Sequence, residues 1–258
     1  MVFEWFATIP WPLAFLTLLV LCLLLVGVFT AVSMRFDPTD RTNDNVGRAA
    51  LAFVSSAFIF VGAFTIITSW DEAATLHATS THEVVAAQTL WREVRLLAPS
   101  DTTVSRSLGD YAHAVLRDET GVGGELAPST EAEDAFIGVE SAATVVTERP
   151  GADTYRAEEI RDSLNDLKVA RQDRVGELSN TIALPLIVLL LMMAALNLIG
   201  IGLFPGGTSR ALKITFGVVV AVAAASLLTS VVLLESAQFI HPGLAQPFES
   251  LIADLGGR

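Results

Sequence analysis

The stretch RQDRVGELSNTIALPLIVLLLMMAALNLIGIGLF, residues 171–204, begins as a charged helical sequence and ends in a long apolar run. The run from Ile182 to Phe204 can cross a hydrocarbon core, which needs about 20 apolar residues. Upstream of it, apolar residues recur at helical spacing at Ile160, Leu164, Leu167, Val175, Leu178 and Ile182. Arg171 is the one polar interruption of this stripe, and Pro185 can be accommodated in a membrane helix. We therefore predict one long helix that joins a polar helical bundle to a membrane span.

Three further apolar runs are long enough to span a membrane: Trp11–Ser33, Ala49–Trp70 and Leu212–Leu234. The hydrophobic share of 52% and the mean hydropathy of +0.55 lie above the range of ordinary soluble proteins. No Lys or Arg precedes Arg35, so we expect the first run to remain as a span and not to be cleaved as a signal peptide. The sequence predicts an all-α integral membrane protein with four transmembrane helices.

The spans divide the chain into four parts. We expect an N-terminal tail and transmembrane hairpin at 1–70, an acidic helical extramembrane domain at 71–180, a second hairpin at 181–236 and a C-terminal tail at 237–258. The middle part holds 21 Asp or Glu against 10 Lys or Arg, so it carries most of the net charge of −12. Such a segment repels phosphate backbones, and we therefore exclude nucleic-acid binding. Within it, Thr130 and Glu133 have the spacing of a helix capping box.

Small and polar residues in the last two spans are candidates for helix packing or for an interface. Gly217, Ala221 and Ala225 form a four-residue repeat that permits close helix contact, either within the chain or between subunits. Asn197 needs a hydrogen-bond partner at membrane depth; an interhelical bond is the main interpretation and a permeation role the alternative. Glu235 ends the fourth span, where it is either solvated at the headgroups or part of a docking or ion-path site.

The second span offers a candidate constriction but no reactive chemistry. Three phenylalanines share one of its faces and suit lipid contact, packing or a channel constriction: Phe53, Phe60 and Phe64. His77 and His82 are spaced poorly for one metal, and the single Cys22 excludes a cysteine cluster. Phosphate-binding loops, HExxH motifs and nucleophile elbows are absent from the sequence. We predict no catalytic, cofactor-binding or metal-binding residue and no enzymatic activity.

Four short motifs carry a resemblance to a known family. They are YAHAVLRDE at 111–119, the arginine pair of ARQDRVGEL at 170–178 followed by Pro185, the acidic end of the fourth span at Glu235, and the dipeptide Pro247-Phe248. Together with the span pattern, they resemble a bacterial family of bestrophin-like membrane proteins. The resemblance implies a four-span subunit, an oligomer and, by analogy, an anion channel.

The distribution of basic residues predicts the orientation in a bacterial plasma membrane. The two short loops carry Arg35, Arg41, Arg48, Arg210 and Lys213, which favours the cytoplasmic side for these loops. The acidic helical domain would then lie outside the cytoplasm. Four basic residues close to the third span count against this orientation: Arg161, Lys168, Arg171 and Arg174.

These observations favour a non-enzymatic accessory or scaffold subunit of a bacterial cell-envelope complex. Its partners would be the lipid bilayer and either other membrane subunits or further copies of the chain, without a cofactor. The alternative is an oligomeric bestrophin-like anion channel. An envelope sensor and a membrane enzyme built on scattered acidic residues are the remaining possibilities.

Overall fold

The computed structural model describes residues 10–35, 44–120, 127–178, 184–203, 210–234 and 237–256. The helices are α2 (Trp11–Arg35), α3 (Asp44–Leu97), α4 (Thr103–Asp118), α5 (Thr130–Thr147), α6 (Thr154–Leu178), α7 (Leu184–Leu203), α8 (Arg210–Leu234) and α9 (Ala237–Gly256). The described residues contain no strand, which confirms the all-α prediction. The chain forms two compact units, an apolar one (Met1–Trp70 with Ile182–Glu235) and a polar one (Asp71–Thr181 with Ser236–Arg258).

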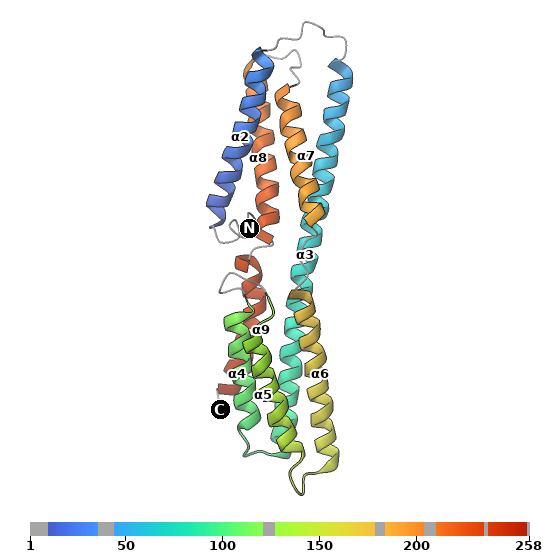
Figure 1. Ribbon diagram of the computed structural model, residues 1–258, viewed down its shortest axis with the longest axis vertical. Coiled ribbons are helices and arrows are strands. Elements are labelled where there is room, and N and C mark those ends of the chain that lie inside the picture. The colour runs from blue at the N-terminus through green and yellow to red at the C-terminus, as the bar shows by residue number, and fades with distance from the viewer. Residues whose placement is uncertain are drawn as a thin grey trace. The chain divides into compact units, whose positions relative to one another are not determined.

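The apolar unit consists of α2, the first part of α3, α7 and α8 (Figure 1). Helix α2 contacts both α7 and α8, and its buried face includes Leu18, Cys22 and Val26. The helical stretches Trp11–Val32 and Ile214–Leu233 are long and apolar enough to cross a membrane, as is part of Ala49–Leu97; the stretch in α7, Leu186–Ile201, is shorter. Most side chains on the outer faces of these helices are apolar, as in a protein whose solvent is lipid.

A continuous helix joins the second predicted span to the bundle. Helix α3 runs for 54 residues from Asp44 to Leu97 without interruption, so its first part belongs to the apolar unit and the remainder to the polar unit. We had predicted such continuity at the third span. That junction, residues 179–183 between α6 and α7, lies outside the described residues.

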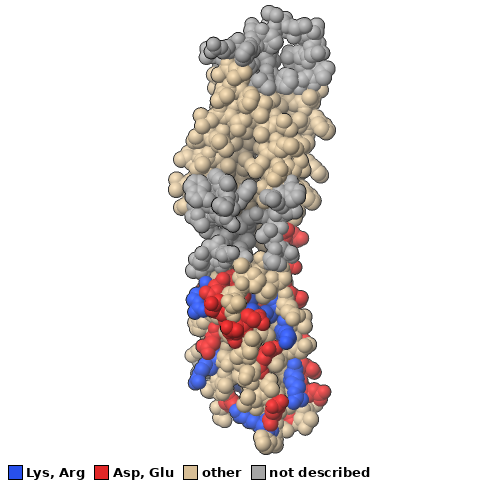
Figure 2. Space-filling model, viewed as in Figure 1, with Lys and Arg blue, Asp and Glu red and all other residues tan. Residues whose placement is uncertain are grey.

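The polar unit is a helical bundle of the remainder of α3 with α4, α5, α6 and α9 (Figure 1). Each helix turns an apolar stripe inward, and the core includes Leu90, Leu108, Val139, Ile160 and Leu167. Charged side chains of both signs lie on the visible face of this unit, and the acidic ones gather most densely toward its upper end in this view (Figure 2).

The segment that we expected to be a C-terminal tail forms helix α9, which packs against α4. Its Phe248 and Leu251 are buried in the bundle core. Pro247 lacks the backbone N–H that would pair with the carbonyl of Gly243 inside a helix. The imidazole of His77, on α3, lies with Nδ1 2.6 Å from that carbonyl oxygen and supplies the missing donor. This tertiary contact explains how α9 tolerates Pro247, a residue type that usually interrupts a helix.

The predicted capping box at Thr130 is displaced by one residue. Ser129 is the N-cap of α5, and its hydroxyl accepts the backbone N–H groups of Glu131 and Ala132. The capping prediction was wrong because two adjacent hydroxyl residues precede the helix and either can cap it. Glu133 is thereby released from a capping role, and its carboxylate pairs with Arg171 of α6.

Candidate functional site

The three phenylalanines of the candidate constriction lie on the outside of the chain. On α3, Phe53 is 75% exposed, Phe60 73% and Phe64 54%. They repeat at seven and four residues, so they share one face of the helix. No side chain of the same chain covers them to any large extent, and this face is open to lipid or to another copy.

The small-residue repeat of α8 lies inside the chain. Ala221 and Ala225 are fully buried, and a Cβ atom added to Gly217 would lie 2.8 Å from Cγ1 of Val26 on α2. These positions therefore serve close packing between α8 and its neighbours within one subunit.

Asn197 has the interhelical partner that an amide requires at membrane depth. Ser55 of α3 donates a hydrogen bond to its Oδ1 at 2.8 Å, and Asn197 is 5% exposed. This bond links α3 to α7. The remaining candidate, Glu235, lies outside the described residues.

An ion-pair network in the bundle core is the feature that the sequence analysis did not identify. At its centre, the guanidinium of Arg174 donates through Nε to Glu83 of α3 and through Nη2 to Glu119, 2.7 Å away at the end of α4. Glu83 and Glu119 are fully buried, and the Arg174 side chain is 1% exposed. Burial alone would lower the pKa of Arg174, but Glu83 and Glu119 raise it above its usual value. Arg174 is therefore a permanent cation held by two buried carboxylates.

Arg171, one turn earlier on α6, extends the network toward the surface. Its Nη1 donates to the hydroxyl of Tyr111 at 2.8 Å, and its Nη2 lies 3.7 Å from Glu119. Its Nε and Nη2 both donate to Oε2 of Glu133, at 3.2 Å and 3.0 Å. Burial would lower the pKa of Arg171, but the charge of Glu119 and the hydrogen bonds to Tyr111 and Glu133 outweigh it and raise the pKa. Arg171 thus remains charged while it bridges the core and the surface.

Aromatic rings enclose the two guanidinium groups. Arg171 stacks on the rings of Tyr111 and Phe136, with centroid distances of 5.2 Å and 5.3 Å, and Arg174 lies 5.3 Å from the ring centroid of Phe248. Burial and the adjacent Glu83 carboxylate raise the pKa of Tyr111 far above its ordinary value. The phenol is therefore protonated, donates to Glu83 and accepts from Arg171. The network ties α3, α4, α5, α6 and α9 together.

The network has the chemistry of a structural element. Within the described part of the chain, every buried side-chain nitrogen or oxygen has a hydrogen-bond partner. The same residues contain no group of three or more His, Cys, Asp or Glu side chains that could hold a metal ion. A fully satisfied set of buried charges specifies one packing arrangement.

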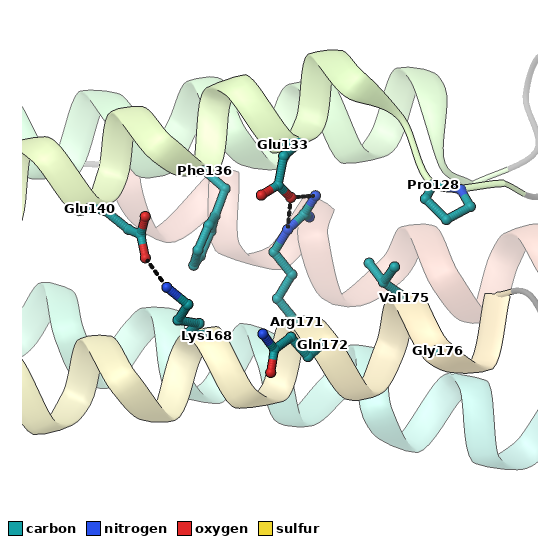
Figure 3. A pocket seen from close by; sticks show the side chains of 9 residues that line it. All are labelled: Pro128, Glu133, Phe136, Glu140, Lys168, Arg171, Gln172, Val175 and Gly176. Carbon is teal, nitrogen blue, oxygen red and sulfur yellow. Dashed lines mark hydrogen bonds and ion pairs between the residues drawn. The ribbon is translucent and has the colours of Figure 1, made fainter.

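A groove of about 400 Å³ opens beside the network between α5 and α6 (Figure 3). Glu133 and Glu140 project into it from α5, and Lys168 and Arg171 project from α6. Two ion pairs cross the groove on either side of the Phe136 ring.

The comparisons with known proteins identify the family. A profile of the Bestrophin-like domain matches residues 12–249. The chain belongs to this family. The bestrophin-like chain resembles a crystal structure of a bacterial bestrophin homologue from Klebsiella pneumoniae, with 13% sequence identity, a TM-score of 0.71 and coverage of 94% of this chain and 98% of that chain. A single-substitution form of the homologue gives the same identity and TM-score, with coverage of 95% and 99%. A comparison with curated protein sequences gives no match.

These findings establish a bestrophin-like membrane protein and confirm the resemblance inferred from short motifs. Three of those motifs meet in space at the network. Tyr111 and Glu119 come from the first motif, Arg171 and Arg174 from the second, and Phe248 from the C-terminal dipeptide. In this structure, residues of three of the four motifs form one packed cluster.

Proposed function

We propose that the protein is a subunit of an oligomeric anion channel of the bestrophin type and has no enzymatic activity. Membership of the bestrophin-like family supports a channel better than an accessory subunit, because the resemblance implies anion conduction. Four spans fit this proposal, since the 20 residues of α7 extend about 30 Å at a rise of about 1.5 Å per residue. The chain would cross the membrane at α2, the first part of α3, α7 and α8.

The observation that carries the proposal is the exposed phenylalanine face of α3. If copies of the chain surround an axis with this face inward, Phe53, Phe60 and Phe64 form stacked apolar rings. Such rings can act as a constriction that opens and closes by wetting. Cation channels use rings of Asp or Glu, and residues 49–70 contain neither. The composition of this face therefore suits anions or neutral solutes better than cations.

Self-association is favoured over docking to an unrelated subunit. The repeat of Gly217, Ala221 and Ala225 is occupied by packing within the chain, so it does not offer a surface to a partner. The exposed apolar faces of α2, α3, α7 and α8 remain for lipid and for other copies. Purification from native membranes distinguishes the two hypotheses. A particle of several identical chains supports the channel, and a particle that always contains one copy with other proteins supports the accessory subunit.

The proposal places the helical domain of residues 71–180 in the cytoplasm, because a bestrophin arrangement has this domain on the cytoplasmic side. The charges of the short loops favour the opposite orientation, so the prediction needs a direct test. Ser100 is exposed in the turn between α3 and α4. We expect a single cysteine there, in a Cys22→Ala background, to resist a membrane-impermeant maleimide in intact cells and to react after lysis. Labelling in intact cells would restore the outside orientation and contradict the bestrophin arrangement.

Ion flux from proteoliposomes tests the activity itself. We expect purified protein to release trapped chloride but not potassium when a counter-ion pathway is supplied. Phe60→Ala should increase chloride flux severalfold, because it removes an aromatic ring from the constriction. Phe216→Ala is the matched control: Phe216 is 58% exposed on α8, outside the phenylalanine face. Absence of chloride flux from vesicles that contain oriented oligomers would reject the proposal, and equal fluxes for the two variants would reject the constriction.

A further inference from the structure

The groove between α5 and α6 has one acidic wall and one basic wall. Lys168 Nζ lies 3.0 Å from Oε1 of Glu140, and Arg171 Nη2 lies 3.0 Å from Oε2 of Glu133. The Phe136 ring lies between the two ion pairs and forms an apolar base (Figure 3). The groove thus offers two positive groups, two negative groups and an aromatic surface within about 400 Å³, which is within the size range of small-molecule sites.

Each ion pair has one partner that solvent reaches: the side chain of Glu133 is 59% exposed and that of Lys168 is 51% exposed. The pair of Lys168 with Glu140 contributes little to stability, because solvent screens its charges. The Arg171 side chain is only 5% exposed, so Glu133 can leave it only if another anion takes its place. A ligand that supplies the same charges in the same places meets this condition.

Arg171 remains in position when Glu133 leaves. The Tyr111 hydroxyl at 2.8 Å holds its guanidinium from the core side, and the rings of Tyr111 and Phe136 lie on its faces. Its Nε and Nη2 both donate to Oε2 of Glu133, so this edge of the guanidinium already binds a carboxylate. Glu133 therefore fills a prepared carboxylate site.

We propose that this groove binds a small zwitterion of the α-amino acid class. The ligand carboxylate replaces Glu133 on the Arg171 guanidinium, with Lys168 nearby, and the ligand ammonium binds the carboxylates released on α5. A simple anion fits less well, because Glu133 and Glu140 repel it, and a simple cation meets Arg171 and Lys168. An apolar ligand side chain can pack on Phe136 and Val175, which also line the groove. The inference does not depend on channel activity.

The test is calorimetric titration of the purified full-length protein with three related probes. L-leucine carries both charges, N-acetyl-L-leucine only the carboxylate, and L-leucinamide only the ammonium. We expect leucine to bind with a dissociation constant of about 1 mM, and each blocked probe to bind at least about tenfold more weakly, because each lacks one charged hydrogen-bonding group. Equal binding of leucine and N-acetyl-L-leucine would show that the groove recognises only the carboxylate, and this result would refute the proposal.

Two glycine variants test the location. A Cβ atom at Gly176, which lines the groove on α6, would meet no other atom within 4 Å, so Gly176→Leu fills the groove without a clash at the backbone. Gly138 on α5 is equally uncrowded but does not line the groove, and Gly138→Leu is the matched control. We expect the first variant to lose leucine binding and the second to retain it. Retained binding in Gly176→Leu would overturn the assignment.

Glu140→Gln tests the acidic wall separately. This substitution keeps the shape of the side chain and removes its charge, so leucine binding should weaken while N-acetyl-L-leucine binding is maintained or improves. Equal weakening for both probes would contradict the assigned role of the α5 carboxylates. Binding and flux are measured independently, so a result that refutes the binding site does not refute the channel, and the reverse also holds.

Discussion

Replacing Arg174 by Met tests whether the buried network holds the bundle together. The substitution removes the cation from Glu83 and Glu119, both of which are fully buried. Glu83 keeps the Tyr111 hydroxyl, and Glu119 keeps the backbone N–H of Ser129 at 2.9 Å. Glu119 also keeps Nη2 of Arg171 at 3.7 Å, so Glu83 is the carboxylate that loses its cation. Breaking a buried pair by removing one partner costs about 3–5 kcal/mol, and we expect a loss of this size.

The assay is thermal unfolding of the full-length protein in detergent, followed by circular dichroism. A change of 1 kcal/mol shifts the melting temperature of a domain of 150–250 residues by about 2–4 °C, so the expected decrease is about 6–20 °C. The control is Arg156→Met on the same helix. Arg156 pairs with Glu93 at 3.3 Å and Glu159 at 3.2 Å, but its side chain is 39% exposed. Exposed pairs contribute about 0–1 kcal/mol, so the control should lose only a few degrees.

Two results would refute this reasoning. If Arg174→Met costs no more than Arg156→Met, the buried pairs do not stabilise the bundle beyond ordinary packing. The triple variant Glu83→Gln, Glu119→Gln, Arg174→Met should be more stable than Arg174→Met alone, because it removes the uncompensated charges together with their partner. If the triple variant is less stable, the cost comes from lost shape and not from buried charge.

Three further substitutions have defined outcomes. Hydrogen bonds from Thr103 and the guanidinium of Arg149 lower the pKa of Asp101, so its stabilising effect is present above the unfolded pKa of about 3.9 and is lost as the pH falls through the lower folded value. The destabilisation by Asp101→Asn should therefore be measurable in thermal melts at pH 7 and should decrease as the pH falls below about 3.9; a destabilisation that does not change with pH would contradict this account. His77→Ala leaves the Gly243 carbonyl without its donor, and denaturant unfolding should show a loss of about 1 kcal/mol that is absent if water replaces the imidazole fully. Gly217→Ala introduces a methyl 2.8 Å from Val26, which should cost about 1–3 kcal/mol and be partly restored by Val26→Ala; an unchanged melting temperature would show that α2 and α8 are loosely packed.

The sequence predicts the helices well because the signals for them are local. Apolar runs that exceed the bilayer thickness, and stripes at helical spacing, depend only on neighbouring residues. The ends of α2 and α8 accordingly lie within a few residues of the predicted spans. Helix α9 was missed for the same reason: Pro247 is a local sign of interruption, and the contact from His77 that compensates for it comes from 166 residues away.

The candidate residues differ in the same way, because some have a local sequence signal and others depend on partners far away in the sequence. Gly217 and Asn197 were identifiable as packing residues, because a small or polar side chain at membrane depth has few other uses. The network was not identifiable, because Arg174 meets Glu83 and Glu119 across sequence separations of 91 and 55 residues. The one available signal was Arg171, a lone charge within an apolar stripe. A cation at such a position requires buried anionic partners, although the sequence does not say which glutamates supply them.

The convergence of three motifs on this network predicts which substitutions the bundle tolerates. Apolar core positions can exchange among Leu, Ile and Val at small cost, because packing depends on volume and pattern. A buried arginine has no such substitute, since a lysine cannot donate from Nε and Nη2 in fixed directions to two partners, as Arg174 does to Glu83 and Glu119. Each carboxylate partner is needed as well, because removing it weakens the compensation of the buried charge. If this reasoning is correct, Arg174→Lys should destabilise the bundle nearly as much as Arg174→Met, even though it retains the charge; a stability close to that of the unmodified protein would show that charge alone, and not guanidinium geometry, maintains the network.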